Sequence, residues 1–171
     1  MNTLELQLDD VTQFFCDVGQ HGWSDLIVAH KADLLVFRVS HVLTDFPAEV
    51  LKIARAIIEN SPIRAALCDE PGGAVIAVEP DKKQPHTSIL SIYEIHGEIA
   101  GFDESEEGKL VLSLRIRRQR LVGMLLAELW KTHVSLKHSS YQNDRSEFPH
   151  KELKVINNIW NASDLGPSFL K

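Results

Sequence analysis

Three strand-like segments follow one another in the middle of the chain with connections too short to contain a helix, and this spacing constrains the fold more than any other feature. The apolar segments 65–69, 73–79 and 87–95 are separated only by residues 70–72 and 80–85, which are rich in proline and other turn-forming residues. Parallel neighbours need a crossover of a dozen or more residues, usually a helix. The spacing therefore predicts an antiparallel β-meander and argues against a doubly wound parallel sheet.

Similar patterns predict further strands on both sides of this meander. Leucines alternate with polar residues over 3–8, and apolar runs fill 23–30 and 31–42, with a hairpin turn expected at 31–33. Apolar and polar residues alternate again over 110–117. We therefore expect a twisted, mainly antiparallel sheet of about six strands.

Helical periodicity is clearest in two long segments. In 45–59, apolar residues recur on one helix face, and Thr44 or Asp45 can cap the start. The period of 118–137 is also helical, and 147–160 has the pattern of a short final helix.

A further short helix is expected near the N-terminus. The apolar residues of 11–18 recur at the spacing i, i+3, i+4 and i+7, and they are followed by Gly19. Asp9 or Asp10 can accept hydrogen bonds from the free amides at the start of such a helix.

Together these elements predict an α+β fold. Helices 45–59 and 118–137 are expected to pack on the apolar face of the sheet, with the short C-terminal helix beside them. With 171 residues, 44% of them hydrophobic, the chain is large enough to bury a core without disulfide bonds. We expect a single domain over 1–160 and a mobile tail over 161–171.

The compartment expected from the sequence is the cytoplasm. No apolar run approaches the ~18–20 residues of a membrane span, and the N-terminal residues lack the basic and apolar regions of a signal peptide. The two cysteines, Cys16 and Cys68, have no metal-binding or redox spacing. In a reducing compartment they are expected to be small buried hydrophobic residues.

The sequence contains no motif for catalysis, a metal or a cofactor. None of the eight histidines forms an i, i+4 pair, and there is no G-x-S-x-G motif. Gly72 and Gly73 follow a proline, which predicts a tight turn rather than a phosphate-binding loop. We therefore expect a protein that is not an enzyme and holds no metal or cofactor. A small enzyme or ligand-binding domain with a pocket near Cys68 and Glu70 remains the alternative.

A basic cluster stands where the predicted strand 110–117 passes into the helix 118–137. It could neutralise phosphates, which would make it a nucleic-acid interface. The net charge of −6 and the absence of aromatic residues between the arginines favour a solvated face, or salt bridges to nearby acids. The members of this cluster are Arg115, Arg117, Arg118 and Arg120.

Acidic residues are the more suggestive feature, because they fall on the turns and loops of one continuous run of hairpins. Loops gathered at one end of a sheet can present a negative field that steers a basic protein into contact. An acidic surface that serves only solubility explains the same charges. The candidate partner-binding residues are Asp69, Glu70, Glu98, Asp103, Glu104, Glu106 and Glu107.

Cap and turn residues follow a distinctive order from Trp23 onward: Ser40, Thr44, Asp45, Pro47, Glu70, Pro71 and Gly72. In this order the sequence resembles small bacterial immunity proteins, the inhibitors encoded beside contact-dependent growth inhibition and other polymorphic toxins. The resemblance covers roughly 23–135 and rests on cap and turn residues. It implies tight binding to a toxin domain, often a nuclease, by covering its active site or substrate surface. Such families share no catalytic residues, so the resemblance assigns no site.

The expected partner is therefore a basic protein toxin. A domain with net negative charge and no catalytic motif has the composition expected of an inhibitor of a basic nuclease. Direct binding to nucleic acid or to a membrane is not expected.

Overall fold

The fold is α+β, as the sequence predicts, but its strands form two sheets instead of one. The computed structural model describes residues 6–19, 21–97, 101–135 and 145–166. In this part of the chain the strands are β1 (Leu8–Asp9), β2 (Gln13–Val18), β3 (Trp23–His30), β4 (Asp33–Ser40), β5 (Ile63–Cys68), β6 (Gly73–Pro80), β7 (Thr87–Ile95) and β8 (Lys109–Arg117). The helices are α1 (Phe46–Ile58), α2 (Arg118–Ser135) and α3 (His150–Ala162).

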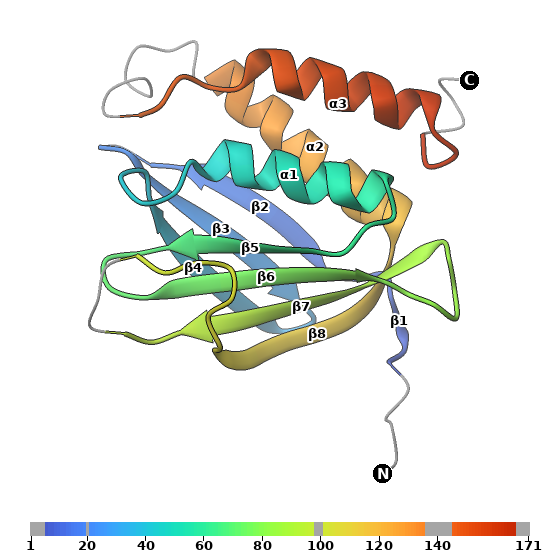
Figure 1. Ribbon diagram of the computed structural model, residues 1–171, viewed down its shortest axis with the longest axis horizontal. Helices are drawn as coiled ribbons and strands as arrows, with labels where there is room; N and C mark the ends of the chain where they lie inside the picture. Colours follow the sequence, from blue (N-terminus) through green and yellow to red (C-terminus); the bar gives the residue numbers. More distant parts are fainter. Residues whose placement is uncertain (1–5, 20, 98–100, 136–144, 167–171) are drawn as a thin grey trace.

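Five strands form one sheet in the order β1-β8-β7-β6-β5, and three form the other in the order β2-β3-β4. Figure 1 shows the three-stranded sheet behind the five-stranded sheet, with the helices along one side of both. Helix α1 packs on β5, α2 packs on β2, and the two helices contact each other. The sheets separate after β4 because the chain leaves it for α1 and returns in β5, which pairs only with β6.

The predicted meander and the predicted first long helix are confirmed. β5, β6 and β7 pair antiparallel in sequence order, and β8 adds antiparallel to β7. In α1, the Asp45 carboxylate accepts a hydrogen bond from the Ala48 amide at 3.2 Å, and Pro47 lies in the first turn. Apolar residues from both sheets and all three helices join in one core.

The short helix expected over 11–18 is wrong, because this segment is the strand β2. Its side chains alternate between solvent and the core: Cys16 is buried, whereas Phe15 is 43% exposed. The Asp9 carboxylate does accept the Thr12 amide at 3.0 Å, but this turn leads into a strand that pairs along its whole length with β3. A capping hydrogen bond of this kind can precede a helix or a strand, and here the pairing with β3 makes the segment a strand.

Smaller differences concern the ends of the chain. The strand expected over 3–8 is observed only as β1, which pairs parallel to β8, while residues 1–5 lie outside the described residues. The final helix begins later than expected and extends to Ala162, so that it is as long as α1. Helix α2 is described to Ser135, and residues 136–144 lie outside the described residues. No described helix is both long and apolar enough to cross a membrane.

The arginines of the basic cluster mostly make internal contacts. Arg115 is buried and forms an ion pair with Asp81, with 2.6 Å between Nε and Oδ2. Arg118 donates to backbone carbonyls at the end of α1, and Arg120 lies 3.9 Å from the Asp9 carboxylate. The expected salt bridges to the acidic stretch 97–108 are not found among the described residues, because Arg115 pairs with Asp81 and Arg120 lies beside Asp9. Of the four arginines, Arg117 alone is exposed, which leaves little free charge for a nucleic-acid interface.

Asp81 gives the fold a dependence on pH with a defined direction. Hydrogen bonds from the Lys83 amide, the Arg115 guanidinium and the Thr87 hydroxyl lower the pKa of Asp81 below its usual value. A carboxyl group whose pKa falls on folding stabilises the folded state above its unfolded pKa. That contribution is lost as the pH falls through the folded pKa.

We therefore expect Asp81→Asn to lower the melting temperature at neutral pH, where it leaves the buried Arg115 guanidinium without its counter-ion. The difference from the unmodified protein should shrink as the pH falls below about 4. Thermal melts of both proteins between neutral and acidic pH measure this difference. A difference that stays constant across the range would show that the charge of Asp81 does not stabilise the fold.

Candidate functional site

The acidic residues of the predicted site come from two connections at the same end of the five-stranded sheet. The β5–β6 turn holds Asp69 and Glu70, and the β7–β8 connection holds the acids of 103–107. Glycine at position 72 brings the two connections together, since a Cβ atom there would lie 2.5 Å from the Ile95 carbonyl oxygen. Glu98, the remaining candidate, lies outside the described residues.

The β5–β6 turn is fixed by its own contacts and by the end of β4. The peptide bond between Glu70 and Pro71 is cis, and the Asp69 amide donates to the Gly72 carbonyl at 2.7 Å. The Ser40 hydroxyl donates to the Glu70 carboxylate at 2.6 Å. Glu70 is therefore held at the junction of the two sheets.

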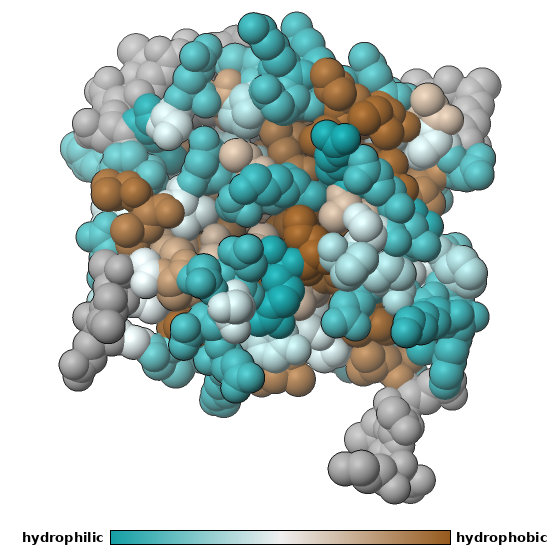
Figure 2. All heavy atoms as spheres, viewed as in Figure 1, coloured by the Kyte–Doolittle hydropathy of each residue, from teal (hydrophilic) through white to brown (hydrophobic). Residues whose placement is uncertain are grey.

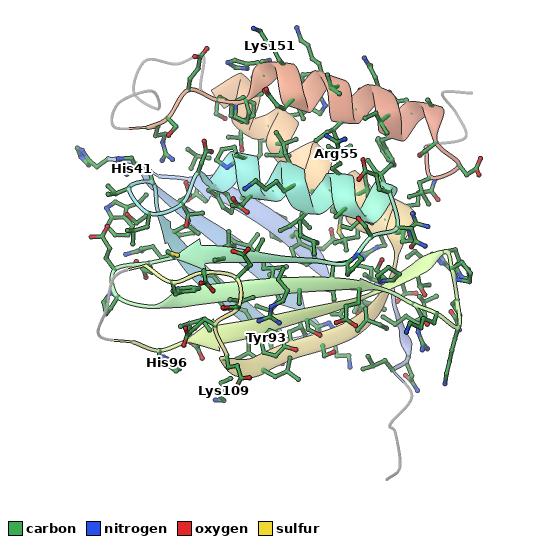
Figure 3. The ribbon with its side chains drawn as sticks, viewed as in Figure 1. His41, Arg55, Tyr93, His96, Lys109 and Lys151 are labelled. Carbon is green, nitrogen blue, oxygen red and sulfur yellow. The ribbon has the colours of Figure 1, made fainter. Side chains whose placement is uncertain are left out.

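We call residues 101–108 the acidic loop; it folds back across the outer face of the five-stranded sheet (Figure 1). Arg64 on β5 anchors it: Nε donates to the Glu104 carbonyl at 2.7 Å, and Nη2 donates to the Glu106 carbonyl at 3.1 Å. The same guanidinium lies 5.3 Å from the ring centroid of Tyr93, which is on β7 (Figure 3). Because Arg64 binds carbonyls, the carboxylates of the loop stay exposed.

Asp103 shows how the loop keeps its charge. The hydroxyl and the amide of Ser105 both donate to one oxygen of its carboxylate. These hydrogen bonds lower the pKa of Asp103 below its usual value. The group therefore remains ionised in mildly acidic as well as neutral solution.

A groove of about 340 Å³ lies between α1 and the acidic loop, and we call it the β5 groove. Four of its side chains are carboxylates and two are cations, so its lining is net acidic. One of the cations, Lys52, is already paired with Glu49 at 2.5 Å. Figure 2 shows this face, where hydrophilic atoms surround a smaller hydrophobic area. The groove is lined by Leu43, Thr44, Asp45, Glu49, Lys52, Ile63, Arg64, Ala66, Cys68, Phe102, Asp103 and Glu104.

Both cysteines are free and buried, as expected. Burial raises the pKa of the Cys16 thiol to about 12, so this thiol is not a nucleophile at neutral pH. Cys68 lines the β5 groove, where its Sγ donates to the Phe102 carbonyl at 3.4 Å. No histidine is among the described residues that line the groove, and Glu70 does not line it. The groove thus supplies Cys68 with no histidine to act as a base.

The sequence did not single out the part of the site that α1 contributes. Asp45 caps α1 and Glu49 lies in its first turn, and both residues also line the β5 groove. Arg64 is an isolated cation in the sequence, and its role depends on a loop 40 residues further along the chain. No local pattern reports such long-range contacts.

Neither a metal cluster in the described part of the chain nor a known relative helps to identify the site. Within the described residues there is no group of three or more histidine, cysteine or acidic side chains that could hold a metal ion. Comparisons with protein-family models, with curated proteins and with solved structures found no match. The function of this chain is therefore inferred from its own geometry and charge.

Proposed function

We propose that this chain is a non-enzymatic immunity protein, which binds a basic toxin domain and covers its active or substrate-binding surface. The observation that supports this proposal best is that the β5–β6 turn, with Asp69 and Glu70, and the acidic loop lie at the same end of the five-stranded sheet. Charges held in one place produce a stronger local field than the same charges spread over a surface. Such a field increases the rate at which a basic partner associates.

The anchoring of the loop also favours a binding role. Arg64 fixes the main chain of the loop while its carboxylates stay exposed, so little conformational entropy is lost when a partner binds. A surface that serves only solubility does not require such an anchor.

A small-molecule site in the β5 groove is the second candidate, because the groove is large enough for a small ligand and contains Cys68. Its discriminating test is thermal stabilisation by a library of small metabolites. A ligand that stabilises the unmodified protein but not a variant with a filled groove, Ala66→Leu, would favour this candidate over the immunity protein.

The proposed function is tested directly by capture of the partner. The tagged protein is expressed together with an inactive variant of the product of the gene immediately upstream. The complex is isolated, its components are identified by mass spectrometry, and its affinity is measured by calorimetry. We expect a stoichiometric complex of nanomolar affinity. Failure of the two purified proteins to associate would contradict the proposal for that partner.

Neutralisation of the acidic loop should slow association with this partner. We expect replacement of the four loop acids by their amides to lower the association rate constant roughly tenfold or more at low salt. The dependence on salt should weaken, and the melting temperature should hardly change, because these carboxylates are exposed. Stopped-flow kinetics at several salt concentrations measure both effects. The substitutions are Asp103→Asn, Glu104→Gln, Glu106→Gln and Glu107→Gln.

A control variant removes the same number of exposed carboxylates elsewhere. It should retain most of the association rate, because its charges lie away from the acidic loop. Equal effects of the two variants would show that only net charge matters and would remove the acidic loop from the interface. The control substitutions are Asp17→Asn, Asp33→Asn, Glu147→Gln and Glu152→Gln.

A further inference from the structure

The outer edge of β5 has backbone groups that point away from the sheet. β5 is the last strand of its sheet and pairs only with β6. The Asp69 amide donates to Gly72, which makes these two residues a hydrogen-bonded pair. Bonded and non-bonded pairs alternate along an antiparallel ladder. Cys68, Ala66 and Arg64 therefore direct their N–H and C=O groups away from β6.

The contact made by Cys68 supports this assignment and marks where the open edge begins. The Cys68 amide donates to the Thr44 hydroxyl at 3.0 Å. This N–H group therefore points away from β6 and already has an acceptor. Within the described residues, no hydrogen bond reaches the amide or carbonyl of Ala66 or of Arg64. An edge with free donors and acceptors is a template for a further strand.

The β5 groove lies along this edge and has the form that an added strand requires. Residues 64, 66 and 68, whose backbone groups point outward, are the residues of β5 that line it together with Ile63. Helix α1 forms one wall and the acidic loop forms the other. At about 3.4 Å per residue, the stretch from Arg64 to Cys68 extends for ~14 Å, which is long enough to pair with several residues of a peptide.

We propose that the β5 edge binds an extended, lysine- or arginine-containing segment of a partner protein as an additional strand. Main-chain hydrogen bonds to Ala66 and Arg64 supply the pairing, as in other cases of strand addition. Alternate basic side chains of the segment meet the carboxylates of the loop wall, Asp103 and Glu104, whereas Glu49 on the α1 wall is already paired with Lys52. The inference rests on the proposed function for the identity of the partner.

The charge of the groove decides between the possible occupants. A second copy of this chain would bring two acidic grooves together across an antiparallel pair of β5 strands, which like-charge repulsion opposes. A basic segment instead finds a net acidic lining of four carboxylates and two cations, in which Asp103 and Glu104 make no side-chain ion pair within the described residues. A partner of positive charge is therefore the occupant that fits.

The binding mode can be tested without the toxin. The probe is a short, capped peptide of alternating lysine and valine, titrated into ¹⁵N-labelled protein. We expect the largest shifts at the amides of Arg64 and Ala66, together with slower hydrogen exchange there. The same peptide with N-methylated backbone on one edge should lose this effect. Equal shifts with both peptides, or shifts confined to other regions, would overturn the proposal.

A substitution on the protein side tests the same edge. Ala66→Pro removes an N–H group that does not serve the ladder with β6, and proline is tolerated at such edge positions. It should weaken peptide binding roughly tenfold or more, whereas the control Ala66→Ser keeps the N–H group and should bind almost as well. If Ala66→Pro fails to fold, the N-methylated peptide carries the test on the folded protein.

The outcomes separate this inference from the proposed function. A partner complex that tolerates Ala66→Pro but weakens when the loop acids are neutralised would leave the function and overturn the strand pairing. Peptide binding at β5 without any complex with the toxin would support the strand pairing and overturn the proposed function for that toxin. A dimer of this chain in sedimentation, abolished by Ala66→Pro, would identify a second copy as the occupant and overturn the basic partner.

Discussion

Arg118→Ala is expected to lower the free energy of unfolding by about 2–4 kcal/mol. The guanidinium of Arg118 donates to the Ile57 carbonyl at 2.7 and 3.0 Å, to the Ile58 carbonyl at 3.0 Å and to the Pro85 carbonyl at 3.0 Å. It thus ties the end of α1 and the β6–β7 connection to the start of α2. The last carbonyls of a helix lack partners within the helix and carry its negative dipole end, which a cation stabilises.

Urea unfolding measures this effect, and Arg118→Lys is the matched control. Lysine keeps the positive charge but cannot reach three carbonyls at once with a planar fork. We expect its stability to lie between those of the other two proteins. Burial lowers the pKa of Arg118 below its usual value, yet the guanidinium remains charged at neutral pH. Equal stability of all three proteins would show that water replaces these hydrogen bonds without loss.

The contacts of Arg118 illustrate what the sequence could and could not predict about this fold. The run of short connections predicted the meander, and the apolar stripe with its cap predicted α1, because both are local properties. The contacts of the basic cluster, in contrast, could not be predicted from neighbouring residues. Arg115 forms an ion pair with Asp81, and Arg118 donates to the Ile57 carbonyl. Both partners are distant in the sequence.

The incorrect helix over 11–18 has a different cause. Phe14 and Val18 fit both a helical and an alternating pattern of apolar residues. A helix would bury Phe15 together with them, whereas a strand would bury Cys16. The structure buries Cys16 at 2% exposure and leaves Phe15 at 43%. A large aromatic residue on the solvent side reverses the usual preference, which single-sequence periodicity cannot anticipate.

The candidate site was predictable to the extent that it follows from antiparallel topology. Successive antiparallel connections alternate between the two ends of a sheet, which places Asp69 beside the acidic loop and puts the β6–β7 connection at the opposite end. The wall formed by Glu49 and the anchor formed by Arg64 were not predictable. They depend on how α1 and the loop pack against β5, and no periodic pattern encodes that packing.

The largest loss of stability is expected from Gly73→Ala, at about 4 kcal/mol or more. Gly73 has a φ angle of +138°, and a Cβ atom there would lie 2.1 Å from the Leu67 carbonyl oxygen. That oxygen belongs to the ladder between β5 and β6, so it cannot move away without breaking a hydrogen bond of the pair formed with Ala74. Both the strain and the clash therefore fall on the hairpin that carries Asp69.

Gly123→Ala in the middle of α2 is the matched control, with an expected effect of opposite sign. A Cβ atom at position 123 meets only ring atoms of Trp160 at 3.7 and 3.8 Å, which is ordinary van der Waals contact. Alanine should therefore raise the free energy of unfolding by about 0.5–1 kcal/mol, because it restricts the unfolded chain and favours the helix. Urea unfolding of both variants measures the contrast. Similar small effects at the two positions would contradict the tight β5–β6 hairpin, and with it the shape of the β5 groove.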